Sequence, residues 1–299
     1  MPDHHRLPRR RFLALAGAAA ATPFLLGAGP ARAGTAGLRD ILTGPDYPIG
    51  FWWPPPPEQT TVARYSEIAE AGFTFVTGGN GVNNLPINAT MLDAAAANGL
   101  RALPTDDRIS GLTGTPPEQW NDVVSKTLAD YEPHPAFSGF SIVDEPDASR
   151  FPGLGDEVAL LRKLHPGLFP FINLLPTYAT VGQLGAPTYQ DYLQQFVDTV
   201  DPSVLSFDHY ALLGPTGIRA DYFQNWALVR QAALAADIPS WVFILAMDHL
   251  GYRRPTPAEL LWQVNVSLSY GCKCIQYFTY WRPAGDGWGQ ALIDIDGNR

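Results

Sequence analysis

Eight apolar stretches recur along the chain, and each of them ends in polar or aromatic residues. The run Trp241-Val242-Phe243-Ile244-Leu245 is typical of them because it is apolar without interruption. Such runs are expected for parallel strands that are covered on both faces. The predicted strands are residues 47–53, 72–79, 100–106, 137–145, 168–175, 204–210, 241–248 and 272–281.

Segments with a helical pattern separate these strands, at residues 60–71, 90–98, 117–131, 155–165, 189–200, 220–236 and 256–270. Thr256-Pro257-Ala258-Glu259 is a capping-box pattern with proline at the first helical position. Strands that alternate with helices predict an α/β fold, a (β/α)8 TIM barrel. A doubly wound open sheet is the competing fold. Its usual glycine-rich phosphate turn is replaced here by Phe51-Trp52-Trp53-Pro54-Pro55.

The C-terminal stretch is too short for the helix that would complete such a barrel. A loop at 283–289 and a short β-like run at 291–295 are followed only by Asp296-Gly297-Asn298-Arg299. We therefore expect a barrel that lacks its last helix. A chain truncated relative to a complete barrel is the favoured explanation, and a different closure of the barrel is the alternative.

The N-terminus has the pattern of a secretory signal. Arg9-Arg10-Arg11 precede an apolar, alanine-rich run, and Ala31-Arg32-Ala33 offers small residues for cleavage. The paired arginines before Phe12 indicate the twin-arginine route, with residues 1–33 as signal peptide and 34–299 as one catalytic domain. The protein is then secreted, periplasmic or bound to the cell surface. The run is too short for a comfortable membrane anchor.

Charge and cysteine content narrow the function further. The formal net charge is −9, and the predicted leader removes five Arg but only one Asp, so the mature chain is more acidic. An acidic domain is a poor nucleic-acid binder and is not drawn to an anionic membrane surface. The two cysteines, Cys272 and Cys274, are too few for a disulfide scaffold or a structural zinc site. Nothing in the sequence indicates an oligomeric state.

Acids, amides and aromatic residues gather at the predicted strand ends, where chemistry lies in such barrels. This combination suits a carbohydrate, because aromatic rings stack on sugar faces while carboxylates and amides bind hydroxyl groups. We therefore expect a sugar-binding site and no cofactor. The substrate-binding candidates are Trp52, Trp53, Asn80, Asp106, Asp144, Asn173, His209, Tyr210, Tyr280 and Trp281. Because adjacent strand residues face opposite ways, we expect either Trp52 or Trp53 to pack in the core.

The segment Phe140-Ser141-Ile142-Val143-Asp144-Glu145-Pro146 resembles the fourth-strand motif of the clan A glycoside hydrolases. The order of elements, the Tyr280-Trp281 pair and the run Ala291-Leu292-Ile293-Asp294 are similar to family 42 β-galactosidases and their uncharacterised relatives. The resemblance implies a glycoside hydrolase with Glu145 as general acid/base. That role requires a carboxyl group of raised pKa, which a neighbouring charged Asp144 would favour.

The chain departs from this clan at the seventh strand, where retaining members carry a nucleophilic glutamate. Here that strand ends Ala246-Met247-Asp248-His249, and only Glu145 of the eight glutamates ends a predicted strand. The second carboxylate must therefore be an aspartate. Asp248 is the positional choice as nucleophile, and Asp208 is the alternative, as nucleophile or as the base that activates water.

Two other classes of function stay open at this stage. The missing glutamate favours a non-catalytic carbohydrate-binding barrel that descends from an enzyme. The pairs Asp208-His209 and Asp248-His249 could instead ligate metal in a metal-dependent hydrolase. Adjacent residues diverge on a strand, so only one of each pair can face the barrel axis, and we expect no metal.

Overall fold

The computed structural model describes residues 40–44 and 46–299. The predicted signal peptide, residues 1–33, lies outside them and stays a prediction. Each of the eight predicted strands overlaps an observed one, and β7 and β8 form a small antiparallel hairpin. The strands are β1 (Ile49–Phe51), β2 (Phe75–Thr77), β3 (Arg101–Leu103), β4 (Gly139–Asp144), β5 (Phe169–Leu174), β6 (Leu205–Asp208), β7 (Leu212–Leu213), β8 (Gly217–Ile218), β9 (Ser240–Leu245) and β10 (Cys274–Phe278).

The parallel strands follow the order of a barrel. Six form one sheet in the order β1-β10-β9-β6-β5-β4, and β2 pairs with β3. Backbone hydrogen bonds connect this pair to both edges of the sheet: Thr74 N–H donates to Ile49 O at 2.9 Å, and Ser138 N–H donates to Ala102 O at 3.1 Å. The predicted TIM-barrel fold is therefore confirmed.

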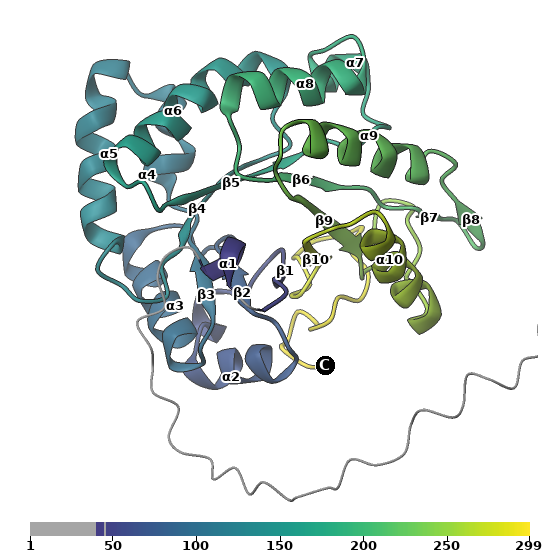
Figure 1. Ribbon diagram of the computed structural model, residues 1–299. Coiled ribbons are helices and arrows are strands. Elements are labelled where there is room, and N and C mark those ends of the chain that lie inside the picture. Colours follow the sequence, from purple (N-terminus) through teal and green to yellow (C-terminus); the bar gives the residue numbers. More distant parts are fainter. Residues whose placement is uncertain (1–39, 45) are drawn as a thin grey trace, which may run out of the picture. The chain divides into compact units, whose positions relative to one another are not determined.

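Most helices lie outside the strands, as in other barrels of this kind (Figure 1), whereas the first helix, Asp40–Thr43, packs Ile41 against the aromatic residues inside the barrel. The helices are α1 (Asp40–Thr43), α2 (Val62–Glu70), α3 (Leu85–Ala97), α4 (Asp107–Ser110), α5 (Pro117–Tyr131), α6 (Phe151–Leu164), α7 (Val181–Leu184), α8 (Tyr189–Val200), α9 (Tyr222–Ala235) and α10 (Pro257–Ser269), with short 3₁₀ turns at Pro57–Gln59, Leu112–Gly114 and Ala148–Arg150. The capping box of Thr256 and Glu259 is confirmed. Helices α3 and α6 begin earlier than expected, each with a proline in its first turn.

Aromatic side chains fill the inside of the barrel. Trp241 lies 5.1 Å from Phe169 and 5.7 Å from Phe75, measured between ring centroids. The ring of Phe75 leaves no room for a side chain at position 50, because a Cβ on Gly50 would lie 2.3 Å from it. A second apolar layer packs between the strands and the helices. This filled interior closes the barrel below the site.

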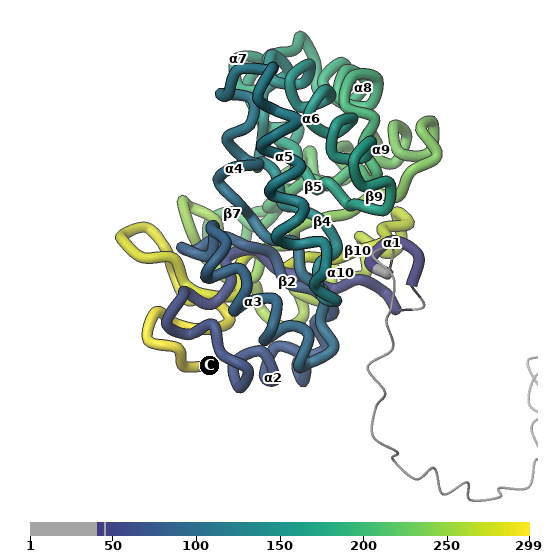
Figure 2. Tube along the Cα trace, turned by 90° about the vertical axis from the view of Figure 1, so that its left-hand side faces the viewer, coloured from purple at the N-terminus to yellow at the C-terminus, as the bar shows by residue number. Residues whose placement is uncertain are grey.

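The chain after β10 forms no helix in the described residues 279–299, as expected from its sequence. Ile293 instead pairs with Trp281 as an isolated parallel bridge. Arg64 of α2 donates to Gly297 O at 2.9 Å, so the C-terminal segment lies against α2 (Figure 2). In the described part of the chain, no helix has the length and apolar character needed to cross a membrane.

Candidate active site

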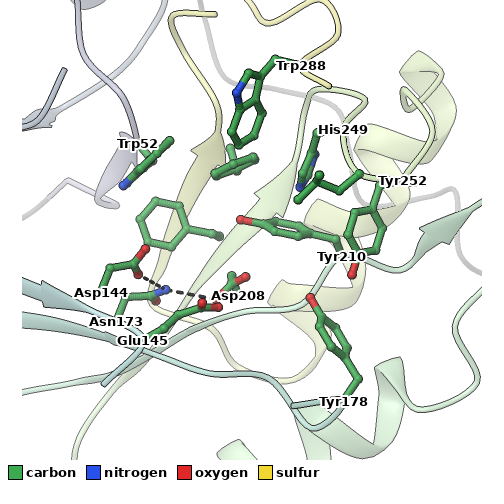
Figure 3. A pocket seen from close by; sticks show the side chains of 13 residues that line it. Trp52, Asp144, Glu145, Asn173, Tyr178, Asp208, Tyr210, His249, Tyr252 and Trp288 are labelled. Atoms are coloured by element: carbon green, nitrogen blue, oxygen red, sulfur yellow. Dashed lines mark hydrogen bonds between the residues drawn. The ribbon is translucent and has the colours of Figure 1, made fainter. Parts of the chain in front are cut away.

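A cavity of about 320 Å³ opens where the C-terminal ends of the strands meet. Six of the thirteen predicted site residues line it: Trp52, Asp144, Glu145, Asn173, Asp208 and Tyr210. The other lining residues are Tyr178, Phe243, His249, Leu250, Tyr252, Phe278 and Trp288. Acids lie on one side of this cavity, and aromatic rings surround the other (Figure 3).

The acidic side is built by β4, β5 and β6. Asp144 ends β4, Glu145 follows it, and Asp208 ends β6. Asn173 of β5 lies between them and donates from Nδ2 to Asp144 Oδ1 at 3.1 Å and to Asp208 Oδ1 at 3.2 Å. Glu145 and Asp208 also share a side-chain hydrogen bond. All three carboxyl groups therefore belong to one connected cluster.

Residues beneath the cluster fix its geometry. The Ser206 hydroxyl donates to Asn173 Oδ1 at 2.9 Å, which directs the Asn173 NH₂ group toward the acids. Glu145 N–H donates to Asn173 O at 2.9 Å. Glu145 has a φ of 46°, in the left-handed region that is uncommon for residues with a side chain. Such conformations occur at functional sites, and here it accompanies the turn of the chain out of β4.

The surroundings of these acids favour their protonated forms. Burial raises the pKa of Asp208 well above its ordinary value, and the nearby Glu145 and Asp144 raise it further. Burial and the charge of Asp144 also raise the pKa of Glu145, while its hydrogen bond with Asp208 lowers it. Burial raises the pKa of Asp144, although its side chain is open to the cavity. Glu145 and Asp208 therefore influence each other's ionisation.

The opposite side presents a continuous aromatic surface. Phe278 stacks on Trp52 with ring centroids 5.1 Å apart and lies 5.0 Å from Tyr210. His249 continues this surface, 4.8 Å from Phe278 and 5.7 Å from Trp288. Burial lowers the pKa of His249, and its Nδ1 lies 3.2 Å from Met247 O, which fits a neutral ring that donates there. Such a surface suits the apolar face of a sugar.

Three predicted aromatic residues lie outside the cavity. Trp53 stacks on Trp52 at 4.4 Å and packs against the hydrophobic core; both residues follow β1, so strand alternation does not apply to them. Tyr280 is buried and stacks on Phe51 at 4.5 Å. Trp281 is also buried, with the Arg64 guanidinium 5.4 Å from its ring centre. All three are packing residues in this structure.

Three predicted polar residues lie outside the cavity and make contacts within the barrel structure. Asn80 donates to Pro54 O at 2.7 Å. Asp106 caps α4 and binds Arg108 at 2.9 Å; burial alone would raise its pKa, but hydrogen bonds from Arg108 and Tyr131 lower it. His209 is buried behind Asp208, 3.4 Å from Asp221, and burial lowers its pKa to about 4.

Asp248, the positional candidate for the nucleophile, also lies outside the cavity. Its Oδ1 accepts from Gln290 N–H at 3.1 Å, and its backbone oxygen accepts from Gly289 N–H at 2.7 Å. Both contacts attach the loop after β10, which carries Trp288 into the cavity. The structure therefore places Asp248 at the base of a loop, and Asp208 in the acidic cluster of the cavity.

Sequence reasoning missed the lining residues that lie on loops. Tyr178 follows β5, Leu250 and Tyr252 follow β9, and Trp288 lies in the long loop after β10. The prediction considered only residues at the ends of the strands, so it did not select these loop residues. The aromatic residues in the loops were the signal that could have identified them.

Metal ligands do not converge in the described part of the chain. No group of three or more His, Cys, Asp or Glu side chains there could hold an ion. The two Asp-His pairs are divided, because His209 points behind the cavity while His249 lies in its aromatic side.

Sequence comparisons found no relative: no protein-family model matches the chain, and no curated protein matches it. Solved structures do resemble it. Thermotoga maritima Cel5A, solved in complex with cellobiose, is 11% identical, with a TM-score of 0.57 over 86% of this chain and 94% of that one. A glycoside hydrolase family 5 protein from Bacteroides vulgatus is 12% identical, with a TM-score of 0.59 over 83% of this chain and 62% of that one.

A hyperthermophilic endo-β-1,4-glucanase solved with substrate gives a similar result, with 14% identity and a TM-score of 0.52 over 86% of this chain and 93% of the other. Identities this low establish a common fold, and a fold alone does not fix a reaction. The expected resemblance to glycoside hydrolases is thus met at the level of architecture. The chain has the barrel fold that these carbohydrate-active proteins share.

Proposed function

We propose that this protein is a glycoside hydrolase that binds a sugar in the cavity and cleaves its O-glycosidic bond, with Glu145 as general acid/base. The observation that carries the proposal is the position of Glu145. It follows the end of β4, faces a cavity with aromatic rings on the far side, and lies in one cluster with Asp144 and Asp208. The segment Asp144-Glu145-Pro146 supports the same role through its likeness to clan A enzymes and, more specifically, to family 42.

The raised pKa of Glu145 fits this role, since a glycosidic oxygen leaves readily only when an acid protonates it. Burial and Asp144 raise the pKa of Glu145, and burial together with Glu145 and Asp144 raises the pKa of Asp208. Asp208 is then the second carboxylate of the site. Trp52 and Tyr210 would stack on the sugar, and Asn173 would orient the acids.

The experiment is a screen of the mature protein against aryl glycosides and plant and bacterial polysaccharides, with Glu145→Gln beside it. We expect sugar release that EDTA does not affect and that falls about 10²–10⁴-fold in the variant, the usual contribution of general acid–base catalysis. Asp156→Asn, an exposed change on α6, is the matched control and should behave as wild type. Equal activity of wild type and Glu145→Gln would refute the role of Glu145.

A non-catalytic carbohydrate-binding barrel is the second candidate. It is favoured by β9, which directs Phe243 and no acid into the cavity. In that case the folded protein would bind oligosaccharides and release no sugar from any of them.

A further inference from the structure

The arrangement of acids leaves a retaining reaction without a protein nucleophile. The usual mechanisms need a second carboxyl group about 5–5.5 Å from the acid for retention, or about 6.5–9.5 Å for inversion. Asp208 lies on the same side of the cavity as Glu145, in the cluster that Asn173 connects, and β9 directs Phe243 and no acid into the cavity. Among the described residues that line the cavity, every acid lies in this one cluster, and the far side is aromatic.

We propose that the nucleophile belongs to the substrate, and that the site cleaves β-linked 2-acetamido-2-deoxyhexosides by participation of their acetamido group. This inference rests on the proposed function and names its substrate class. Asp144 is the residue that would touch the acetamido N–H. It is adjacent to Glu145, its side chain is open to the cavity, and Asn173 fixes it through Oδ1.

The reaction balances with these groups and one water molecule. The acetamido oxygen attacks C1, the bond from C1 to the leaving oxygen breaks, and Glu145 gives its proton to that oxygen. The hydrogen bond from Asn173 favours the charged form of Asp144, against the effect of burial. This carboxylate stabilises the positive charge that develops at the amide N–H while a cyclic oxazolinium forms. Glu145 then takes a proton from water, whose oxygen attacks C1 as the ring opens and the amide is restored. The product keeps its anomeric configuration.

The cavity fits this substrate in size and in surface. A volume of about 320 Å³ is at the lower end of small-molecule pockets, enough for one substituted sugar ring. Phe278, Trp52 and Tyr210 form an apolar surface opposite the acids, against which the acetamido methyl group and the sugar face can pack. Because the acetamido oxygen must attack opposite the leaving group, only linkages trans to it should react.

The test compares 4-nitrophenyl β-glycosides of glucose and galactose with those of N-acetylglucosamine and N-acetylgalactosamine. We expect release from a 2-acetamido substrate only, and a stepwise fall in rate when the acetyl methyl is mono-, di- and trifluorinated, because fluorine makes the carbonyl oxygen less nucleophilic. Asp144→Asn should lower kcat on that substrate about 10²–10³-fold, as removal of one transition-state partner does. Asp156→Asn again serves as control.

A thiazoline analogue of the cyclic intermediate gives a readout that does not depend on turnover. At 100 times its Kd it should raise Tm by about 5 °C. Release from the 2-hydroxyl glycosides, with no fluorine effect, would overturn this inference and leave the hydrolase standing. Thiazoline binding without any release of nitrophenol would contradict the proposed hydrolase activity, but it would support 2-acetamido sugars as the ligand class. Neither binding nor release would overturn both.

Discussion

Glu145 and Asp208 behave as one titrating pair in this structure. Asp208 is the more deeply buried of the two, and both Glu145 and Asp144 raise its pKa beyond the effect of burial. A pair of this kind loses its protons in steps that belong to both residues together. Burial and the neighbouring acids raise the pKa of both groups, which favours the acid form of Glu145.

Replacement of Asp208 by Ala should therefore move the alkaline limb of the pH–activity profile to higher pH. The change removes the hydrogen bond with Asp208 that lowers the pKa of Glu145, while burial and Asp144 continue to raise that pKa. We expect kcat to fall together with this shift, while KM changes less. The measurement is kcat and kcat/KM from pH 4 to 9 on a substrate found in the screen. An unchanged alkaline limb would show that Asp208 does not influence the ionisation of Glu145.

Strand position predicted the acids of the cavity but could not separate structural aspartates from functional ones. Asp208 and Asp106 both end predicted strands, yet Asp106 is bound by Arg108 only two residues later. The Asp208-His209 pair was ambiguous for another reason. Its sequence does not say which residue faces the axis, and only the register of β6 with β5 and β9 decides this.

The loop after β10, residues 283–290, completes the site from outside the barrel. It places Trp288 beside His249, and it is attached through Asp248, which accepts one backbone N–H at its side chain and one at its carbonyl oxygen. Gly289 packs against Asp248 so closely that an added Cβ would lie 2.0 Å from the carboxyl group. Because this contact joins segments about forty residues apart, no local pattern in the sequence could reveal it.

Gly289→Ala should therefore displace the loop and weaken substrate binding. Loss of the Trp288 contact is expected to raise KM about 2–10-fold, the value of one aromatic contact, with little change in kcat. Trp288→Ala should have the same effect, and the double variant should add nothing further. Substrate titration of the three variants measures this, and additive effects would contradict the anchoring.

Asp248→Asn separates the anchoring role from that of a nucleophile. The amide keeps an oxygen that can accept from Gln290 N–H, so kcat and KM should stay near the wild-type values. Removal of a nucleophile is expected to lower kcat about 10³-fold or more. A fall of that size would show that Asp248 takes part in the reaction.

The barrel as a whole was predictable because its strands are buried on both faces. Eight apolar runs, such as the one in β9, carry that information locally, and the helices between them have caps that can be read in the sequence. The earlier starts of α3 and α6 were missed although Pro86 and Pro152 mark their first turns. The closing of the ring by β2 and β3 was inferred from strand number alone, since these strands are three residues long.

Buried acids also give the whole molecule a pH-dependent stability. Glu157 of α6 is buried, its Oε1 has no hydrogen-bond partner, and burial raises its pKa from 4.5 to about 8, although Arg150 opposes the shift. Between these two values the folded chain keeps a proton that the unfolded chain releases. The free energy of unfolding must then fall as pH rises, by up to about 1.4 kcal/mol per pH unit for one such group.

Glu157→Gln should flatten this dependence, because glutamine stays neutral throughout. Near pH 5 the two proteins should differ little, since Glu157 is protonated there in the folded state. Near pH 8 the variant should be more stable than wild type by a few kcal/mol, since the wild-type chain must bury a charge or retain a costly proton. Urea denaturation at intervals from pH 5 to 8 measures both slopes. Glu118→Gln, an exposed change in the first turn of α5, is the control and should follow wild type. Parallel slopes for wild type and Glu157→Gln would mean that Glu157 is already ionised in the folded protein.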